Sequence, residues 1–187
     1  MIRGTLTNNS DEEFSYVSAR PIEKGIPTFI FFHATGFNGQ TYWQLVEGLD
    51  NKFEGSVNCI SLDQRGHGLS TALTEPERLK DWSLYLQDAL EITDKLEGPL
   101  FCAGHSMGSI VAAKLSSLRQ EKVKKLIMLE PVLYGPLECF KYRLMRAIGR
   151  RNKVELVELA AKRRSIFGSQ QEMVDSYHGR GVFETWD

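Results

Sequence analysis

The chain has 187 residues and a formal net charge of −1, from 23 basic and 24 acidic side chains. Hydrophobic residues make up 42% and charged residues 25%, an ordinary composition for a globular protein, which excludes wholesale disorder. The near-zero charge argues against a nucleic-acid partner, and no apolar run reaches the roughly 18 residues that a membrane span needs.

Short apolar runs alternate with segments of helical spacing from residue 14 to about residue 135. The expected strands are Phe14–Ala19, Thr28–His33, Val57–Leu62, Leu100–Ala103 and Lys125–Leu129. Apolar residues recur every three or four positions in 82–96 and 110–118, which predicts two helices, with Asp81 as the N-cap of the first. Strands that are apolar throughout are buried on both faces, so we expect an α/β fold: a three-layer sandwich with a mostly parallel sheet.

The pattern changes after Pro136, and Leu137–Tyr177 is expected to be helical throughout. Residues 141–164 hold nine basic and two acidic side chains. Two interpretations stay open: a solvated helix face, or an electropositive lid that attracts anionic substrates or a membrane surface. The expected domains are residues 1–135, a core with a sheet, and residues 136–187, an incomplete helical lid.

The strongest chemical signal is Gly104-His105-Ser106-Met107-Gly108, which lies between a predicted strand and a predicted helix. In this setting G-x-S-x-G forms a sharp turn that exposes a nucleophilic serine. The two glycines let strand and helix pack closely, and Ser106 Oγ projects at a helix N-terminus. There the Met107 amide can bind a developing oxyanion. The alternative is a glycine-rich turn whose serine merely caps the helix.

Two further segments follow predicted strands. They are His33-Ala34-Thr35-Gly36-Phe37 and Asp63-Gln64-Arg65-Gly66-His67-Gly68-Leu69-Ser70. With the serine turn they resemble the α/β-hydrolase family, whose members carry H-G-x-G-like, D-x-R-G-H-G-x-S and G-x-S-x-G segments in this order. The resemblance implies that the Thr35 and Met107 amides form the oxyanion hole and that His33 and His67 are scaffold residues. Ala34 stands where the family usually has glycine.

A serine nucleophile needs a general base and a group that orients it. His178 is the histidine that follows Ser106 in the chain, and Glu130, directly after the strand Lys125–Leu129, is the best placed acid. One interpretation is a Ser106–Glu130–His178 triad. The other is truncation: the family's acid and histidine follow later strands, beyond residue 187, and the chain carries the N-terminal portion of the fold. Lys125–Leu129 is then an open sheet edge, and self-association is expected.

The resemblance predicts a serine hydrolase that acts on an ester, thioester or related carboxyl derivative through an acyl-enzyme on Ser106. The alternatives are the same fold with lyase or acyltransferase chemistry, a catalytically incomplete fragment, or a non-catalytic interaction module. The expected partner is a small-molecule substrate with an apolar acyl group.

Neither a metal nor another cofactor is expected, because the histidines show no metal-ligand spacing. The three cysteines, Cys59, Cys102 and Cys139, form no disulfide framework, and the N-terminal residues contain no apolar signal segment. Both features predict a cytoplasmic protein.

Overall fold

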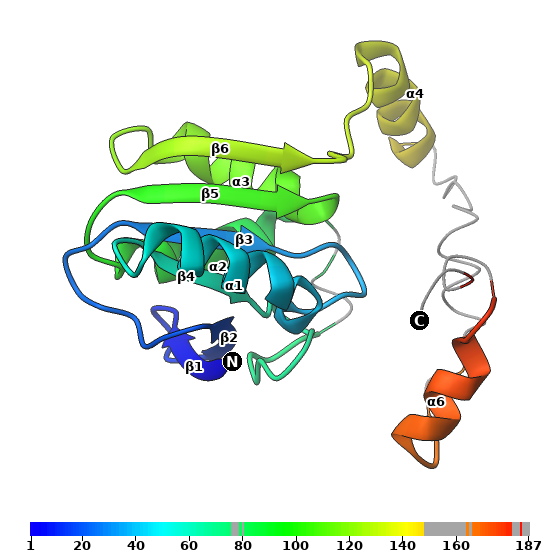
Figure 1. Cartoon of the computed structure of the whole chain (residues 1–187). Coiled ribbons are helices and arrows are strands. Elements are labelled where there is room, and N and C mark those ends of the chain that lie inside the picture. Colours follow the sequence, from blue (N-terminus) through cyan, green and yellow to red (C-terminus); the bar gives the residue numbers. More distant parts are fainter. Residues whose placement is uncertain (76–78, 80, 148–163, 165, 181–183, 185–187) are drawn as a thin grey trace. The chain divides into compact units, whose positions relative to one another are not determined.

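The computed structural model describes residues 1–75, 79, 81–147, 164, 166–180 and 184. The chain divides into two compact units, Met1–Leu133 and Tyr134–Asp187. The first unit is built on a six-stranded sheet (Figure 1). Its strands are β1 (Ile2–Thr7), β2 (Glu13–Ser18), β3 (Thr28–Phe32), β4 (Asn58–Leu62), β5 (Leu100–His105) and β6 (Val123–Leu129).

The strands lie in the order β1-β2-β4-β3-β5-β6. Strands β4, β3, β5 and β6 pair in parallel, whereas β1 and β2 pair antiparallel to their neighbours. The predicted mostly parallel sheet is therefore confirmed. Strand β1 was not predicted, because its residues are all exposed or half-buried and lack a continuous apolar run.

Helices cover both faces of the sheet: α1 (Trp43–Phe53) packs on one face, and α2 (Ser83–Asp94) and α3 (Met107–Leu118) on the other (Figure 1). All five residues of β3 are buried. Its side chains alternate between the two faces, with Ile30 and Phe32 in the α2–α3 cluster and Phe29 and Phe31 in the α1 cluster. The three-layer α/β sandwich is thus confirmed.

Two details of the helices differ from the prediction. Helix α1 was not predicted, and only Val46 and Asp50 of its residues are buried, so its apolar signal is short. Asp81 lies one residue before the N-cap of α2, which is Trp82, but its carboxylate still accepts a hydrogen bond from Ser83 N at 2.9 Å.

The second unit contains α4 (Pro136–Ala147) and α6 (Gln170–Tyr177). The prediction of a helix throughout Leu137–Tyr177 is wrong at residues 166–169, which are not helical. Ser169 is the N-cap of α6, and its hydroxyl accepts a hydrogen bond from Glu172 N at 3.1 Å. Most of the basic segment 141–164 lies outside the described residues. None of the helices described here is long and apolar enough to cross a membrane.

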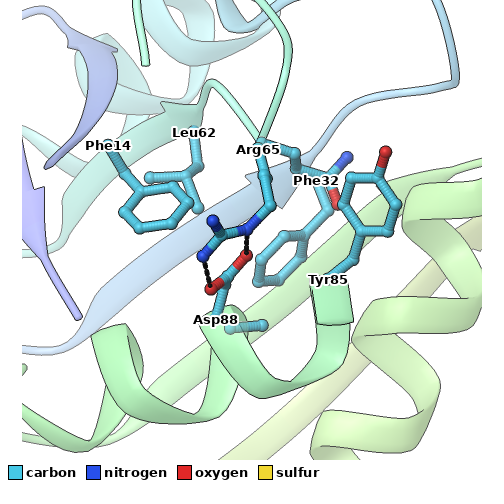
Figure 2. A pocket seen from close by; sticks show the side chains of 8 residues that line it. Phe14, Phe32, Leu62, Arg65, Tyr85 and Asp88 are labelled. Carbon is cyan, nitrogen blue, oxygen red and sulfur yellow. Dashed lines mark hydrogen bonds and ion pairs between the residues drawn. The ribbon is translucent and has the colours of Figure 1, made fainter. Parts of the chain in front are cut away.

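Arg65 is a charged side chain held inside the first unit (Figure 2). Its guanidinium donates two hydrogen bonds to the buried Asp88 carboxylate, at 2.8 and 2.7 Å, and further hydrogen bonds to Glu12. The hydrogen bond from Arg65 holds the pKa of Glu12 at about 2. Phe14 and Tyr85 help to line a narrow pocket around the pair, whose volume of about 10 Å³ has room for roughly one water molecule. Arg65 thus joins the β1–β2 turn, the turn after β4, and α2.

Replacing Arg65 by methionine leaves the Asp88 carboxylate buried without its cation. We expect the Arg65→Met variant to lose about 3–5 kcal/mol of unfolding free energy in urea denaturation. The matched control is Arg119→Met, because Arg119 forms a similar pair with Asp94 on the surface at 2.7 Å. That variant is expected to lose about 1 kcal/mol or less. Equal losses in the two variants would contradict a structural role for the buried pair.

Candidate active site

The sheet order reverses at β3, which has β4 on one side and β5 on the other. The connection from β3 to β4 runs through α1 on one face, and the connection from β4 to β5 runs through α2 on the opposite face (Figure 1). The chain therefore diverges at the carboxyl ends of β3 and β5, where open α/β sheets bind their ligands. Two predicted segments follow these strands. They are the segment predicted to form the oxyanion hole, residues 33–37, which we call the oxyanion loop, and the serine turn, residues 104–108.

Ser106 forms a sharp turn between β5 and α3. Its backbone has φ 53° and ψ −116°, a left-handed region that a residue with a side chain rarely adopts. The Ser106 N–H donates to the carbonyl of Leu129 at the end of β6, at 3.0 Å. The side chain is half-buried, at the N-terminus of α3. The strained backbone is the one that the motif predicts.

The two glycines of the motif are needed because backbones nearly touch there. A Cβ on Gly104 would lie 2.3 Å from the carbonyl carbon of Gly108, and a Cβ on Gly108 would lie 2.1 Å from the carbonyl oxygen of Phe32. No side chain fits at either distance. Glycine at both positions therefore brings β3, β5 and α3 together around Ser106.

Ser109 secures this turn and was not identified from the sequence. Its hydroxyl oxygen lies 2.5 Å from the carbonyl of Gly104 and 2.9 Å from that of Leu129, so it bridges the ends of β5 and β6. Ser109 is fully buried. No spacing rule singles out such a serine inside a helix, and its role follows only from the strands that the fold brings beside it.

Thr35 and Met107 lie in contact. The Thr35 hydroxyl is 3.4 Å from Met107 Sδ, which places the loop after β3 against the first residue of α3. Thr35 is exposed, whereas Met107 is buried. The two residues predicted to supply the oxyanion hole thus come from neighbouring segments. Their amides as an oxyanion hole remain a prediction.

His33 is buried and holds the oxyanion loop through a hydrogen bond to its backbone. Its Nε2 accepts a hydrogen bond from Gln64 N at 2.9 Å, so Nδ1 carries the proton and donates to the carbonyl of Ala34 at 2.8 Å. Burial lowers the pKa of His33 to about 4, against the opposing effect of its hydrogen bond to Ala34. His33 is therefore neutral at pH 7 and acts as a scaffold residue.

His67 supports the same loop from the turn after β4. Its Nε2 accepts from Gly36 N at 3.2 Å, and Nδ1 donates to the carbonyl of Arg65 at 2.9 Å. The His67 and His33 rings lie 4.9 Å apart, edge to face. His33 and His67 thus hold the backbone on either side of Thr35.

The in-chain candidates for the triad lie in different units. Glu130 follows β6 in the first unit, has φ 43°, and its carboxylate lies 3.7 Å from His105 Nε2. His178 is the C-cap of α6 in the second unit, and its backbone N–H donates to the carbonyl of Val174 at 2.8 Å. The Ser106–Glu130–His178 triad therefore remains a prediction.

His105, which directly precedes Ser106, has a hydrogen-bond partner that was not identified from the sequence. Its Nδ1 lies 2.8 Å from the Tyr42 hydroxyl. Tyr42 ends the short 3₁₀ helix η1 (Gly39–Tyr42) that follows the oxyanion loop.

Among the described residues, no cluster of three or more histidine, cysteine or acidic side chains could hold a metal ion.

A serine at positive φ between a parallel strand and a helix, at the point where the sheet order reverses, defines the α/β-hydrolase fold. The model of one family of these proteins, the serine aminopeptidases S33, matches residues 27–179. The chain belongs to this family.

Two curated relatives are similar to this chain. It is 34% identical over 104 residues to (E)-2-((N-methylformamido)methylene)succinate hydrolase of Acinetobacter baylyi, a match that covers 55% of this chain and 37% of that protein. It is 26% identical over 170 residues to protein phosphatase methylesterase 1 of Debaryomyces hansenii, covering 83% and 39%. The chain thus spans less than half the length of these two relatives.

Solved structures with the same fold include the thioesterase domain from the curacin biosynthetic pathway, with a TM-score of 0.61 and 21% identity. That match covers 81% of this chain and 55% of the domain. Mouse alpha/beta hydrolase domain-containing protein 10 also has a TM-score of 0.61, with 20% identity and coverage of 80% and 57%. At 21% and 20% identity, these two similarities show only that the fold is shared.

The depressed pKa of His33 predicts how stability depends on pH. His33 binds a proton near pH 6.5 when unfolded and near pH 4 when folded, so acid favours unfolding between these values. Between pH 7 and pH 4 the wild-type protein is expected to lose about 3 kcal/mol more unfolding free energy than a His33→Asn variant. Urea denaturation at both pH values measures the difference. The control is His178→Asn at an exposed histidine, and a pH dependence of His33→Asn equal to that of wild type contradicts the prediction.

Proposed function

We propose that this chain supplies the nucleophile and the oxyanion hole of a serine hydrolase that cleaves an ester, thioester or related carboxyl derivative. The observation that carries the proposal is the strained backbone of Ser106, at φ 53° on the N-terminus of α3. Strain of this kind persists only where the surrounding packing enforces it, and it is concentrated at active sites. Here the contacts of Gly104 and Gly108 enforce it.

In the proposed reaction, Ser106 Oγ attacks the carbonyl carbon of the substrate and gives its proton to a general base. The carbonyl oxygen becomes an oxyanion, which accepts hydrogen bonds from the Thr35 and Met107 amides. Collapse of the tetrahedral intermediate expels the alcohol or thiol, which takes the proton, and leaves an acyl group on Ser106. Water then releases the acid. The proposed base is His178, oriented by Glu130, or a histidine outside this chain.

The names of the relatives support the substrate class, since they describe a substituted succinate hydrolase, a methylesterase and a thioesterase. We propose a small-molecule substrate with an apolar acyl group. Phe37 supports this proposal, because it lies two residues after Thr35, is 44% exposed, and its ring is 6.1 Å from that of His105. An exposed apolar side chain therefore lies near His105, the residue that precedes Ser106.

Two further predictions from the sequence remain proposals. Residues 136–187 are proposed to form part of a cap, which is supported by the exposed apolar residues Leu137, Phe140 and Leu144 on α4. A cytoplasmic location is supported by the cysteines, since Cys59, Cys102 and Cys139 are all free.

A fluorophosphonate probe tests the proposed nucleophile, because it labels only an activated serine. We expect the wild-type chain to be labelled on Ser106 and the Ser106→Ala variant to lose at least about 99% of the label, as measured by mass spectrometry of the intact protein and its peptides. The control is Ser116→Ala on the same helix, where the hydroxyl donates to the Ala112 carbonyl. Equal labelling of Ser106→Ala and wild type refutes the assignment of Ser106 as the nucleophile.

The same experiment distinguishes the alternative functions. Labelling without turnover of esters or thioesters favours lyase or acyltransferase chemistry, and a wild type that is not labelled favours the non-catalytic alternatives.

Strand β6 supports the proposed self-association. It pairs with β5 on one side, and no strand among the described residues pairs with its other side (Figure 1). Its apolar side chains Leu126, Ile127 and Leu129 are 39%, 51% and 43% exposed. If two copies pair antiparallel with Ile127 opposite its equivalent, Lys124 of each chain faces Glu130 of the other. Opposite charges and paired backbone groups then favour a dimer through this edge.

Placing a lysine at the centre of that edge tests the dimer. We expect the wild-type chain to sediment as a dimer and Ile127→Lys as a monomer in analytical ultracentrifugation, because the charge would be buried at the pairing axis. The control is Leu118→Lys at the end of α3, a leucine that is 55% exposed and lies outside β6. A wild-type monomer, or dimers of both variants, contradicts the proposal.

A further inference from the structure

The Tyr42 hydroxyl lies between the two segments of the candidate active site. Its oxygen is 3.3 Å from the amide nitrogen of Ala34 in the oxyanion loop and 2.8 Å from Nδ1 of His105 beside Ser106. These residues are eight and 63 positions from Tyr42 in the sequence. One phenol group therefore contacts both the oxyanion loop and the serine turn, whose relative position matters for the proposed reaction.

The neighbouring groups determine where the protons lie. The Ala34 N–H donates to the Tyr42 oxygen, which leaves the hydroxyl proton of Tyr42 free to donate elsewhere. His105 Nε2 lies 3.7 Å from the Glu130 carboxylate, and this negative charge favours a proton on Nε2. Nδ1 of His105 is then an acceptor, and Tyr42 donates to it. The hydrogen bonds run from Ala34 to Tyr42 and from Tyr42 to His105.

Tyr42 is also held rigidly by its other contacts. Its ring centroid lies 4.4 Å from that of Phe31 and 6.3 Å from that of Phe37. The helix η1 that carries it begins at Gly39, whose N–H donates to the buried Asp63 carboxylate at 2.7 Å. Burial raises the pKa of Tyr42, so the hydroxyl keeps its proton at neutral pH. A ring fixed in this way fixes the position of its single polar atom.

We propose that Tyr42 is a positioning residue that sets the distance between the oxyanion loop and Ser106. Its hydroxyl binds the amide of Ala34, which directly precedes Thr35, and the ring of His105, which directly precedes Ser106. A displacement of about 1 Å between nucleophile and oxyanion donors costs up to about 100-fold in rate. This inference rests on the proposed serine hydrolase, but the hydrogen bonds themselves are testable without any activity.

Two kinds of measurement on the full chain test the hydrogen bonds of Tyr42 and its positioning role separately. Nitrogen-15 NMR of the histidine side chains, together with hydrogen exchange of the Ala34 amide, reports the hydrogen bonds. The rate of fluorophosphonate labelling of Ser106 reports the positioning. The test variant is Tyr42→Phe, which removes the hydroxyl alone, and the control is Tyr134→Phe at an exposed tyrosine of the second unit. His33 and His67, with protons on Nδ1, serve as internal references for His105, with its proton on Nε2.

In Tyr42→Phe we expect the His105 Nδ1 resonance to shift, the Ala34 amide to exchange about 10-fold faster, and labelling to slow about 10-fold. A His105→Leu variant is expected to slow labelling equally, and the double variant to be no slower than either single variant, because both changes break one chain of hydrogen bonds. Unchanged His105 resonances and Ala34 exchange overturn the contacts. Changed resonances with unchanged labelling overturn the positioning role. If wild type is not labelled at all, the proposed function fails, and the NMR and exchange data alone decide whether Tyr42 joins the two segments.

Discussion

The close approach of three backbones at Ser106 is the constraint on which the rest of the site depends. The carbonyl of Phe32, the backbone of Gly108 and the backbone of Gly104 leave no room for a Cβ between them. Because β3, β5 and α3 meet without intervening side chains, the chain must turn within one residue, and Ser106 takes the strained conformation. The same contact brings the loop after β3 beside the N-terminus of α3.

Side-chain hydrogen bonds then hold this arrangement in place. His33 and His67 bind the backbone of the oxyanion loop, and Ser109 binds the ends of β5 and β6. Each of these side chains binds backbone groups, so the loop after β3 and the serine turn are held by hydrogen bonds. The buried ion pair of Arg65 and Asp88 has a different role, because it joins the turns around the sheet.

The sequence predicted the central strands, the helices α2 and α3, and the serine turn, because each has a strong local pattern. The continuous apolar run of β3 and the G-x-S-x-G spacing are visible without any tertiary information. Strand β1 is an exposed edge strand, and its residues carry no such pattern. Tyr42 and Ser109 could not be predicted, because their partners lie far away in the chain or on another element and meet them only in the folded protein.

We propose that Ser106, Thr35 and Met107 form one catalytic centre, and the decisive experiment is a crystal structure of the chain after reaction with a fluorophosphonate. The account predicts phosphorus bonded to Ser106 Oγ, with the phosphoryl oxygen about 3 Å from the amide nitrogens of both Thr35 and Met107. An adduct on another side chain, or a phosphoryl oxygen directed away from these two amides, would contradict it.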